Sequence, residues 1–170
     1  MDIPRKNLYK LSKKNLILKK NFDLIISLLL ILLIGWLIFF IWLAVSIKFK
    51  SNGFFVQKRV GRCGVLFSFI KFKTMSNLYN ISSSVSALNQ KNITTFGMFL
   101  RKYKIDELPQ LYNVLVGDMS FVGPRPDVPG FADELTGIDK SILSLRPGIT
   151  GPASIKYKSE ETLLINSEDP

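Results

Sequence analysis

Histidine is absent from this chain of 170 residues, and cysteine occurs once, at Cys63. Without histidine, neither a Ser-His nor a Cys-His relay can form, and no imidazole can bind a metal ion. A single thiol excludes an intrachain disulfide and a multi-cysteine zinc site, and with them the disulfide-stapled secreted folds. Any catalysis must therefore use carboxylates, amines, guanidinium groups, hydroxyls or a cation held by carboxylates.

Charge is absent from one long segment. The 24 residues from Leu24 to Ile47 carry no charge and are rich in Leu, Ile, Phe and Trp. At about 1.5 Å per residue such a helix is roughly 36 Å long, which is enough to cross a bilayer. A cleaved signal peptide is the competing interpretation, but its apolar core usually has only ~7–15 residues. We expect a basic juxtamembrane segment at 1–23, a membrane helix at 24–47 and a cytoplasmic domain at 48–170.

Both flanks of this apolar segment are basic. Residues 1–23 hold seven Lys and Arg against two acids, and residues 48–73 hold seven more with no acid. Because positive flanks stay in the cytoplasm, this symmetry favours a re-entrant helix that returns to the same side, with an ordinary span as the alternative. A re-entrant segment needs a break in its helix, normally at proline. No proline is present, so Gly35 is the candidate hinge.

Acidic residues are also missing between Asp23 and Asp106, where eleven basic residues lie from Lys48 onwards. One interpretation of this charge is attraction to anionic lipid headgroups. The other is a binding site for an anion. Phe54–Val60 and Val65–Lys73 are β-prone runs separated by Gly-Arg-Cys-Gly, which predicts a hairpin. The period of two places Lys71 and Lys73 on one face, roughly 7 Å apart, as a candidate phosphate site.

The remaining pattern predicts short helices and loops. Residues 76–95 are polar and weakly patterned, which indicates a loop. A helix is expected from Phe96 to Lys102, another just after it, and an amphipathic helix from about Phe131 to Leu145. The second helix is expected to carry Pro109 in its first turn and Gly117 as its C-terminal cap. Its apolar repeat predicts one buried face, made of Leu108, Leu111, Tyr112 and Leu115.

These elements predict a mixed α/β fold that is mostly helical. It has one N-terminal membrane helix, expected to be re-entrant, and a small globular domain with a β-hairpin and interfacial amphipathic helices. Nucleic-acid binding is not expected despite the net charge of +10, because the charge lies beside a membrane segment without exposed aromatic interleaving.

Two adjacent acids, Asp106 and Glu107, are the candidate catalytic residues. They open the second helix, where acids also serve as ordinary caps, so capping alone is one interpretation. The other follows from the basic residues just before them, among them Arg101. One carboxylate could attack phosphorus while its neighbour holds a divalent cation such as Mg²⁺ against the same phosphate. Further candidate phosphate- or nucleotide-binding residues are Pro124, Arg125, Pro126 and Arg146, because flanking prolines restrict the backbone around each guanidinium.

The run from Phe99 to Pro126, with Asp106-Glu107-Leu108-Pro109 and Pro124-Arg125-Pro126 inside it, resembles the signature of the bacterial sugar transferases. These are small monotopic polyprenol-phosphate phosphoglycosyl transferases. The Lys71–Met75 block, the hairpin from Gln57 to Gly64 and the block from Arg146 to Gly151 are similar to further family blocks in the same order. The resemblance covers roughly residues 15–170.

The resemblance implies a two-step reaction at the cytoplasmic face of the bacterial plasma membrane. Asp106 matches the family's nucleophile, which attacks the β-phosphorus of a UDP-sugar and releases UMP. Undecaprenyl phosphate then accepts the phosphosugar from the enzyme. Glu107 matches the acid that binds Mg²⁺, and Pro124–Pro126 match the motif associated with the nucleotide. The product would enter a surface glycan pathway, such as capsule, lipopolysaccharide or glycoprotein synthesis, through downstream glycosyltransferases.

The sequence departs from this family in three places. The helix-breaking proline is missing, Lys73 replaces the arginine of the usual Lys-Phe-Arg block, and the chain ends at Pro170, earlier than is usual. The lysine exchanges a bidentate fork for a point charge. From the early end we expect a catalytic domain that is truncated at its C-terminus. Two other functions stay open: a non-catalytic basic module anchored to the membrane, and a glycosyltransferase that releases UDP.

Overall fold

The computed structural model describes residues 12–76, 92–137 and 139–156. Most of the predicted loop at 76–95, the first part of the basic segment and the chain after Lys156 lie outside the described residues. Within them the protein is mostly helical, with one long apolar helix, a β-hairpin and several short helices. The expected fold class is therefore confirmed.

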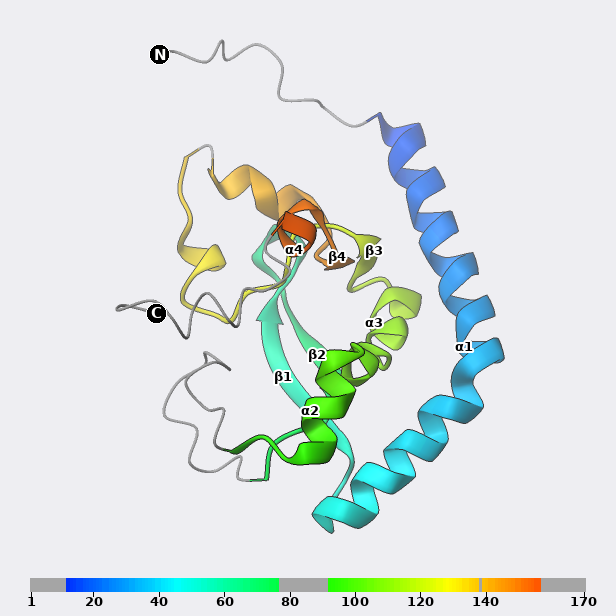
Figure 1. Cartoon of the computed structure of the whole chain (residues 1–170). Coiled ribbons are helices and arrows are strands. Elements are labelled where there is room, and N and C mark those ends of the chain that lie inside the picture. The colour runs from blue at the N-terminus through cyan, green and yellow to red at the C-terminus, as the bar shows by residue number, and fades with distance from the viewer. Residues whose placement is uncertain (1–11, 77–91, 138, 157–170) are drawn as a thin grey trace.

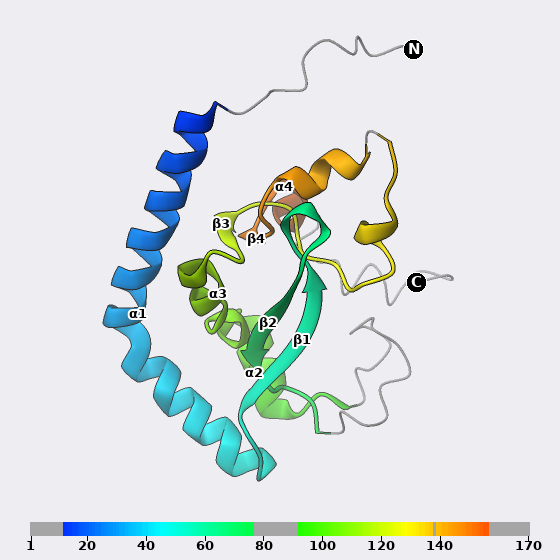
Figure 2. The ribbon, with the colours of Figure 1, turned by 180° about the vertical axis from the view of Figure 1, so that it is seen from behind.

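Helix α1 runs from Lys13 to Phe49 and is both longer and more continuous than the sequence indicates. It is apolar and long enough to cross a membrane by length and composition. It stays helical through Gly35, so the break expected there is not observed. Instead the helix bends near its middle and curves around the rest of the molecule (Figures 1 and 2).

Both halves of α1 contact the same globular domain. In the N-terminal half, Lys19 donates to Ser120 Oγ, and Asp23 Oδ1 accepts the Phe121 amide at 3.3 Å. In the C-terminal half, Val45 is fully buried against Phe72 and its neighbours. Between these contacts the outward face is a continuous exposed apolar surface that includes Leu29, Leu32, Leu33, Trp36, Phe40 and Leu43. A helix whose two halves pack on one domain fits the re-entrant topology, which stays a prediction.

The hairpin forms as predicted. Strand β1 (Phe54–Val60) pairs antiparallel with β2 (Leu66–Phe72), and Phe55 lies opposite Lys71. The turn contains a 3₁₀ segment, η1 (Arg62–Gly64). A second, parallel pair joins β3 (Ser120–Val122) to β4 (Gly148–Thr150), and helix α4 (Pro152–Lys156) follows. The hairpin lies at the centre of the molecule, on the concave side of the bent α1 (Figures 1 and 2).

Helix α2 spans Thr95–Lys102, within one residue of the prediction, and Thr94 caps it by accepting the Gly97 amide at 3.0 Å. The 3₁₀ turn η3 (Ile105–Glu107) and helix α3 (Gln110–Val116) follow. Pro109 is the N-cap of α3 rather than a residue of its first turn, and Gly117 ends the helix with φ of 89° as expected.

Two expectations about the helices are wrong. The buried face of α3 consists of Gln110, Leu111, Asn113 and Val114, whereas Tyr112 is 54% exposed. The pattern failed because two polar residues are buried, and apolar periodicity cannot predict that. The amphipathic helix expected from Phe131 to Leu145 is divided into two 3₁₀ segments, η4 (Ala132–Glu134) and η5 (Asp139–Ser144). Gly137 adopts a left-handed φ of 61° between them, which interrupts a helix.

Candidate active site

Lys71 reaches the site from β2. Its strand neighbours on the same face, Phe67 and Phe69, are buried with Val114 and Met119. This packing directs that face of the hairpin toward α3. Lys71 is half-buried, and its ammonium lies 5.4 Å from the centre of the Phe55 ring on the paired strand. The same face of β2 therefore packs on α3 through Phe67 and Phe69 at one end and presents the ammonium of Lys71 at the other.

Asp106 enters the site from the tight connection between α2 and α3. The chain reverses at Lys104, whose φ is 56°, and then forms the η3 turn. Ile105 and Leu108 pack against the cluster of Phe72 and Leu100. These two apolar anchors flank Asp106 in sequence and hold the turn in place. The acids therefore occupy a 3₁₀ turn immediately before α3, rather than the first turn of a regular α-helix.

The carboxyl group of Asp106 is buried without full hydrogen bonding. The residue is 5% exposed, and its Oδ1 has no hydrogen-bond partner in the part of the chain that the structure describes. Burial raises the pKa of Asp106, the adjacent Glu107 raises it further, and the positive charges of Lys71, Arg101 and Lys104 oppose that rise. The N-cap of η3 is Lys104 and that of α3 is Pro109, so Asp106 occupies the N-cap position of neither element, and neither has a side-chain cap hydrogen bond. These observations speak against capping as the sole role of Asp106.

Cations surround this carboxyl group. Burial lowers the pKa of Lys71 to about 8, Arg101 and Arg59 lower it as well, and Asp106 and Glu107 act in the opposite direction. Arg101 Nε donates to Thr74 Oγ1 at 3.0 Å, which ties the end of α2 to the residues after β2. The structure thus brings Lys71, Arg101, Asp106 and Glu107 into one electrostatic cluster, although they come from three elements.

The segment Pro124–Asp127 lies beside the hairpin. The Gly148 amide donates to the Pro124 carbonyl at 2.8 Å, and the Val60 amide donates to the Asp127 carbonyl at 2.9 Å. Pro126 is buried, while the side chain of Arg125 is exposed. The segment is therefore held by its backbone at both ends, and the guanidinium of Arg125 is accessible.

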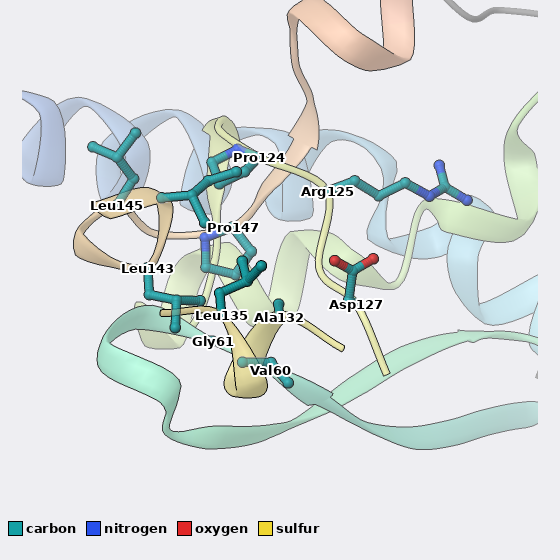
Figure 3. Close-up of a pocket in the computed structure, with 11 residues that line it drawn as sticks. Val60, Gly61, Pro124, Arg125, Asp127, Ala132, Leu135, Leu143, Leu145 and Pro147 are labelled. Carbon is teal, nitrogen blue, oxygen red and sulfur yellow. The ribbon is translucent and has the colours of Figure 1, made fainter. Parts of the chain in front are cut away.

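An apolar pocket adjoins this segment (Figure 3). Its walls include Val60 at the end of β1, Pro124, Leu143 and Pro147. In Figure 3, Arg125 extends away from these apolar residues, and Asp127 lies near it on the same side. The pocket offers an apolar surface with a charged group at its edge.

One of the candidate residues, Lys73, lies elsewhere, and the backbone of another, Arg146, lies beside the Pro124–Asp127 segment. Lys73 Nζ donates to Ser51 Oγ at 3.0 Å, near the end of α1, and its charge is not among those that shift the pKa of Asp106. Lys71 and Lys73 therefore do not form the expected pair around one phosphate. Arg146 is half-buried next to Pro147, and its carbonyl lies close to Gly123.

Arg59 was missed. It lies on β1, on the face that carries Gln57 and Phe55, and is paired with Phe67. Its guanidinium contacts Pro126, and its charge acts on Lys71 and Arg125. The same period of two that selected Lys71 would have placed Arg59 on this face.

A magnesium ion fits the acids that the structure provides only if other ligands complete its shell. No group of three or more His, Cys, Asp or Glu side chains that could hold a metal occurs among the described residues. Mg²⁺ in phosphoryl-transfer sites commonly takes one or two carboxylates and completes its shell with water and substrate phosphates. The adjacent Asp106 and Glu107, with one carboxylate oxygen unpaired, match that donor set.

Comparison with known proteins gives one family match and several relatives. The model of the bacterial sugar transferase family matches residues 14–168. The chain is 38% identical over 144 residues to the uncharacterized sugar transferase EpsL of Bacillus subtilis, covering 85% of this chain and 71% of EpsL. It is 35% identical over 152 residues to the UDP-glucose:undecaprenyl-phosphate glucose-1-phosphate transferase of Klebsiella pneumoniae, covering 87% of this chain and 33% of that protein.

A third relative is the undecaprenyl-phosphate galactose phosphotransferase of Salmonella typhimurium, with 35% identity over 164 residues, 85% of this chain and 33% of the relative. The chain thus spans about a third of the length of the Klebsiella and Salmonella proteins. The family match covers most of the chain, including α1, the hairpin, the Asp106–Glu107 turn and the Pro124–Pro126 segment. The chain therefore belongs to the bacterial sugar transferase family.

Proposed function

We propose that this protein transfers a sugar 1-phosphate from a UDP-sugar to undecaprenyl phosphate. In the first step, an oxygen of the Asp106 carboxylate attacks the β-phosphorus of the donor. The bond between that phosphorus and the bridging oxygen breaks, and UMP leaves with the bridging oxygen. In the second step, a phosphate oxygen of undecaprenyl phosphate attacks the phosphorus of the aspartyl-phosphosugar. The Asp106 carboxylate is regenerated, and undecaprenyl-diphosphate sugar is the product.

The observation that carries this proposal is the buried Asp106 carboxyl with an unpaired Oδ1. An oxygen without hydrogen bonds keeps its lone pairs available for attack, and burial removes the water that would otherwise stabilise its charge. Lys71 and Arg101 supply positive charge close by, which favours the ionised form of Asp106. They would also stabilise the additional negative charge of a bound diphosphate.

Glu107 would hold the Mg²⁺ ion. When bound, the ion would withdraw electron density from the diphosphate and favour departure of UMP. Arg125, exposed beside the apolar pocket, would bind the nucleotide end of the donor, with the pocket receiving its base. The diphosphate then lies between the pocket and Asp106.

We place the site at the cytoplasmic face of the bacterial plasma membrane. The exposed apolar face of α1 would lie in the lipid, and the basic residues on both sides of the apolar run favour the cytoplasm. Because both halves of α1 pack on the domain, the acceptor phosphate at the lipid surface and the soluble donor could reach the same site without crossing the membrane.

The test is to identify the nucleotide that the protein releases in nanodiscs with Mg²⁺, undecaprenyl phosphate and a panel of UDP-sugars. We expect UMP, and a covalent phosphosugar on the chain by intact mass when the acceptor is omitted. Asp106→Asn should abolish both, whereas Asp139→Asn, which removes the charge of an exposed acid, should abolish neither. Release of UDP would show a simple glycosyltransferase. Activity retained in Asp106→Asn would refute the assignment of the nucleophile.

A further inference from the structure

The guanidinium of Arg59 is fixed on several sides. Its Nε and Nη2 donate to Gln57 Oε1 at 3.1 and 2.8 Å, and its Nη1 donates to the Pro126 carbonyl at 3.2 Å. Its carbon Cζ lies 5.6 Å from the centre of the Phe69 ring. The guanidinium thus donates two hydrogen bonds to one amide oxygen and a third to a backbone carbonyl. These three bonds restrict the side-chain rotamer of Arg59.

The residue that Arg59 holds is part of the segment that carries Arg125. Prolines at 124 and 126 have no backbone N–H, so this segment can make few hydrogen bonds of its own. The hairpin compensates with two adjacent bonds. The Val60 amide binds the Asp127 carbonyl, and Arg59 binds the Pro126 carbonyl. These two bonds therefore set the position of Arg125 relative to the hairpin. Because Lys71 lies on β2 of the same hairpin, they also set the position of Arg125 relative to Lys71.

Arg59 occupies an electrostatically unfavourable place. Burial lowers its pKa, Arg125 lowers it further, and Asp127 opposes the change. Its charge also disfavours the protonated form of Lys71. An arginine that is half-buried among other cations costs free energy in the unliganded protein, and that cost would be offset once a diphosphate occupies the space between them.

We propose that Arg59 is a positioning residue that holds the Pro124–Asp127 segment at the distance from Lys71 and Asp106 that a nucleotide diphosphate sugar requires. The inference rests on the proposed function, because the donor defines that distance. Undecaprenyl phosphate lacks a nucleotide and does not need the segment. Loss of Arg59 should therefore impair the first half-reaction and spare the second.

The experiment compares Arg59→Lys and Arg59→Met with Arg62→Lys and Arg62→Met. Arg62 is a matched control, because it lies in the same hairpin and its Nε donates to another backbone carbonyl, that of Ser144, at 3.0 Å. A hydrogen bond from a charged donor is worth roughly 10- to 100-fold in an equilibrium constant, here the one between the held and the displaced segment, so we expect both Arg59 variants to raise KM for the UDP-sugar about 10-fold or more. Arg59→Lys should not restore the wild-type KM, because the ammonium of lysine lacks the planar set of donors with which the guanidinium bonds Gln57 and Pro126 at once.

Two further readouts separate positioning from general damage. Transfer from the isolated phosphosugar enzyme to undecaprenyl phosphate should keep its wild-type rate in the Arg59 variants. Amide exchange at Val60 and Gly148, which hold the segment, should accelerate in these variants and not in the Arg62 variants. Gln57→Leu, which removes the acceptor that orients Arg59, should shift the donor KM in the same direction and serves as a second variant.

Equal donor KM values for the Arg59 and Arg62 variants would overturn the inference, as would an equal loss in both half-reactions. Failure of the proposed function has a different signature. In that case the wild-type protein itself would release no UMP, whereas amide exchange would still report whether Arg59 holds the segment.

Discussion

The side chain of Asn113 on α3 bonds the backbone of β2 at the edge where a further strand would pair. Among the residues that the structure describes, the hairpin sheet has two strands, so the outer edge of β2 pairs with no further strand there. Asn113 is 1% exposed, its Nδ2 donates to the Ser68 carbonyl at 2.7 Å, and its Oδ1 accepts the Ile70 amide at 3.2 Å. One side-chain amide thus docks α3 on β2. Because α3 directly follows the Asp106 turn, the same bonds set the position of Asp106 relative to Lys71.

We expect Asn113→Ala to destabilise the domain by about 1–3 kcal/mol, since a net hydrogen bond contributes ~0.5–1.5 kcal/mol and two are lost. The exposure of 1% places the cost in the upper half of this range, because the Ser68 carbonyl and the Ile70 amide would be left buried without partners. For a domain between the 60–100-residue and 150–250-residue classes, each kcal/mol lowers the unfolding midpoint by roughly 2–8 °C.

The assay is thermal unfolding in nanodiscs, followed by tryptophan fluorescence, with Asn15→Ala as the control. Asn15 is an exposed amide on α1, so its replacement should change the free energy of unfolding by less than about 0.5 kcal/mol. At temperatures where the Asn113 variant is fully folded, its turnover should still be reduced, because α3 is less firmly docked. Equal midpoints for the two variants would refute the docking role of Asn113.

Two further predictions concern pH and packing. Turnover should follow a bell-shaped pH profile: burial and Glu107 raise the pKa of Asp106, so the rate falls as pH drops through that pKa, and protonated Lys71 is lost as pH rises through its pKa of about 8. Lys71→Arg stays charged and should move the alkaline limb upward; an unchanged limb would exclude Lys71 as its source. Gly97→Ala should destabilise by about 1–3 kcal/mol or more, because a Cβ there would lie 2.1 Å from the Thr74 carbonyl oxygen. Gly35→Ala, whose Cβ meets only Ile31 at 4.0 Å, should instead be neutral or stabilise α1 by up to about 1 kcal/mol, and thermal unfolding distinguishes the two.

The parts of the fold that depend on local pattern were predictable. The β1–β2 hairpin follows from its β-prone runs and a glycine-bounded turn, and α2 lies within one residue of the helix expected at Phe96–Lys102. The face of α3 was not predictable, because Gln110 and Asn113 are buried for reasons outside the helix. Asn113 is buried because its side chain bonds the backbone of β2. The free edge of β2 that it bonds can be identified only from the assembled sheet.

The candidate site shows the same division. Asp106 and Glu107 were identified from sequence because they end a long stretch without acids. Their proximity to Lys71 was not derivable from spacing, since it depends on how α3 docks on β2. The pairing of Lys71 with Lys73 failed for a related reason. Alternation places both on one face, but the chain near Lys73 already turns toward Ser51 and the end of α1.

The buried carboxyl group of Asp106, whose Oδ1 has no hydrogen-bond partner among the described residues, lowers the stability of the fold when it is ionised. Its pKa is raised in the folded protein, so the native state binds more protons than the unfolded state between the unfolded and folded pKa values, and stability falls as pH rises through that window. Packing of Ile105 and Leu108 on the Phe72 cluster offsets this cost on both sides of the residue. A carboxyl oxygen is thus buried without a hydrogen-bond partner beside a packed apolar cluster, against the usual rule for buried polar groups. Such a conflict is expected at a functional site, and at Asp106 it coincides with the nucleophile that we propose.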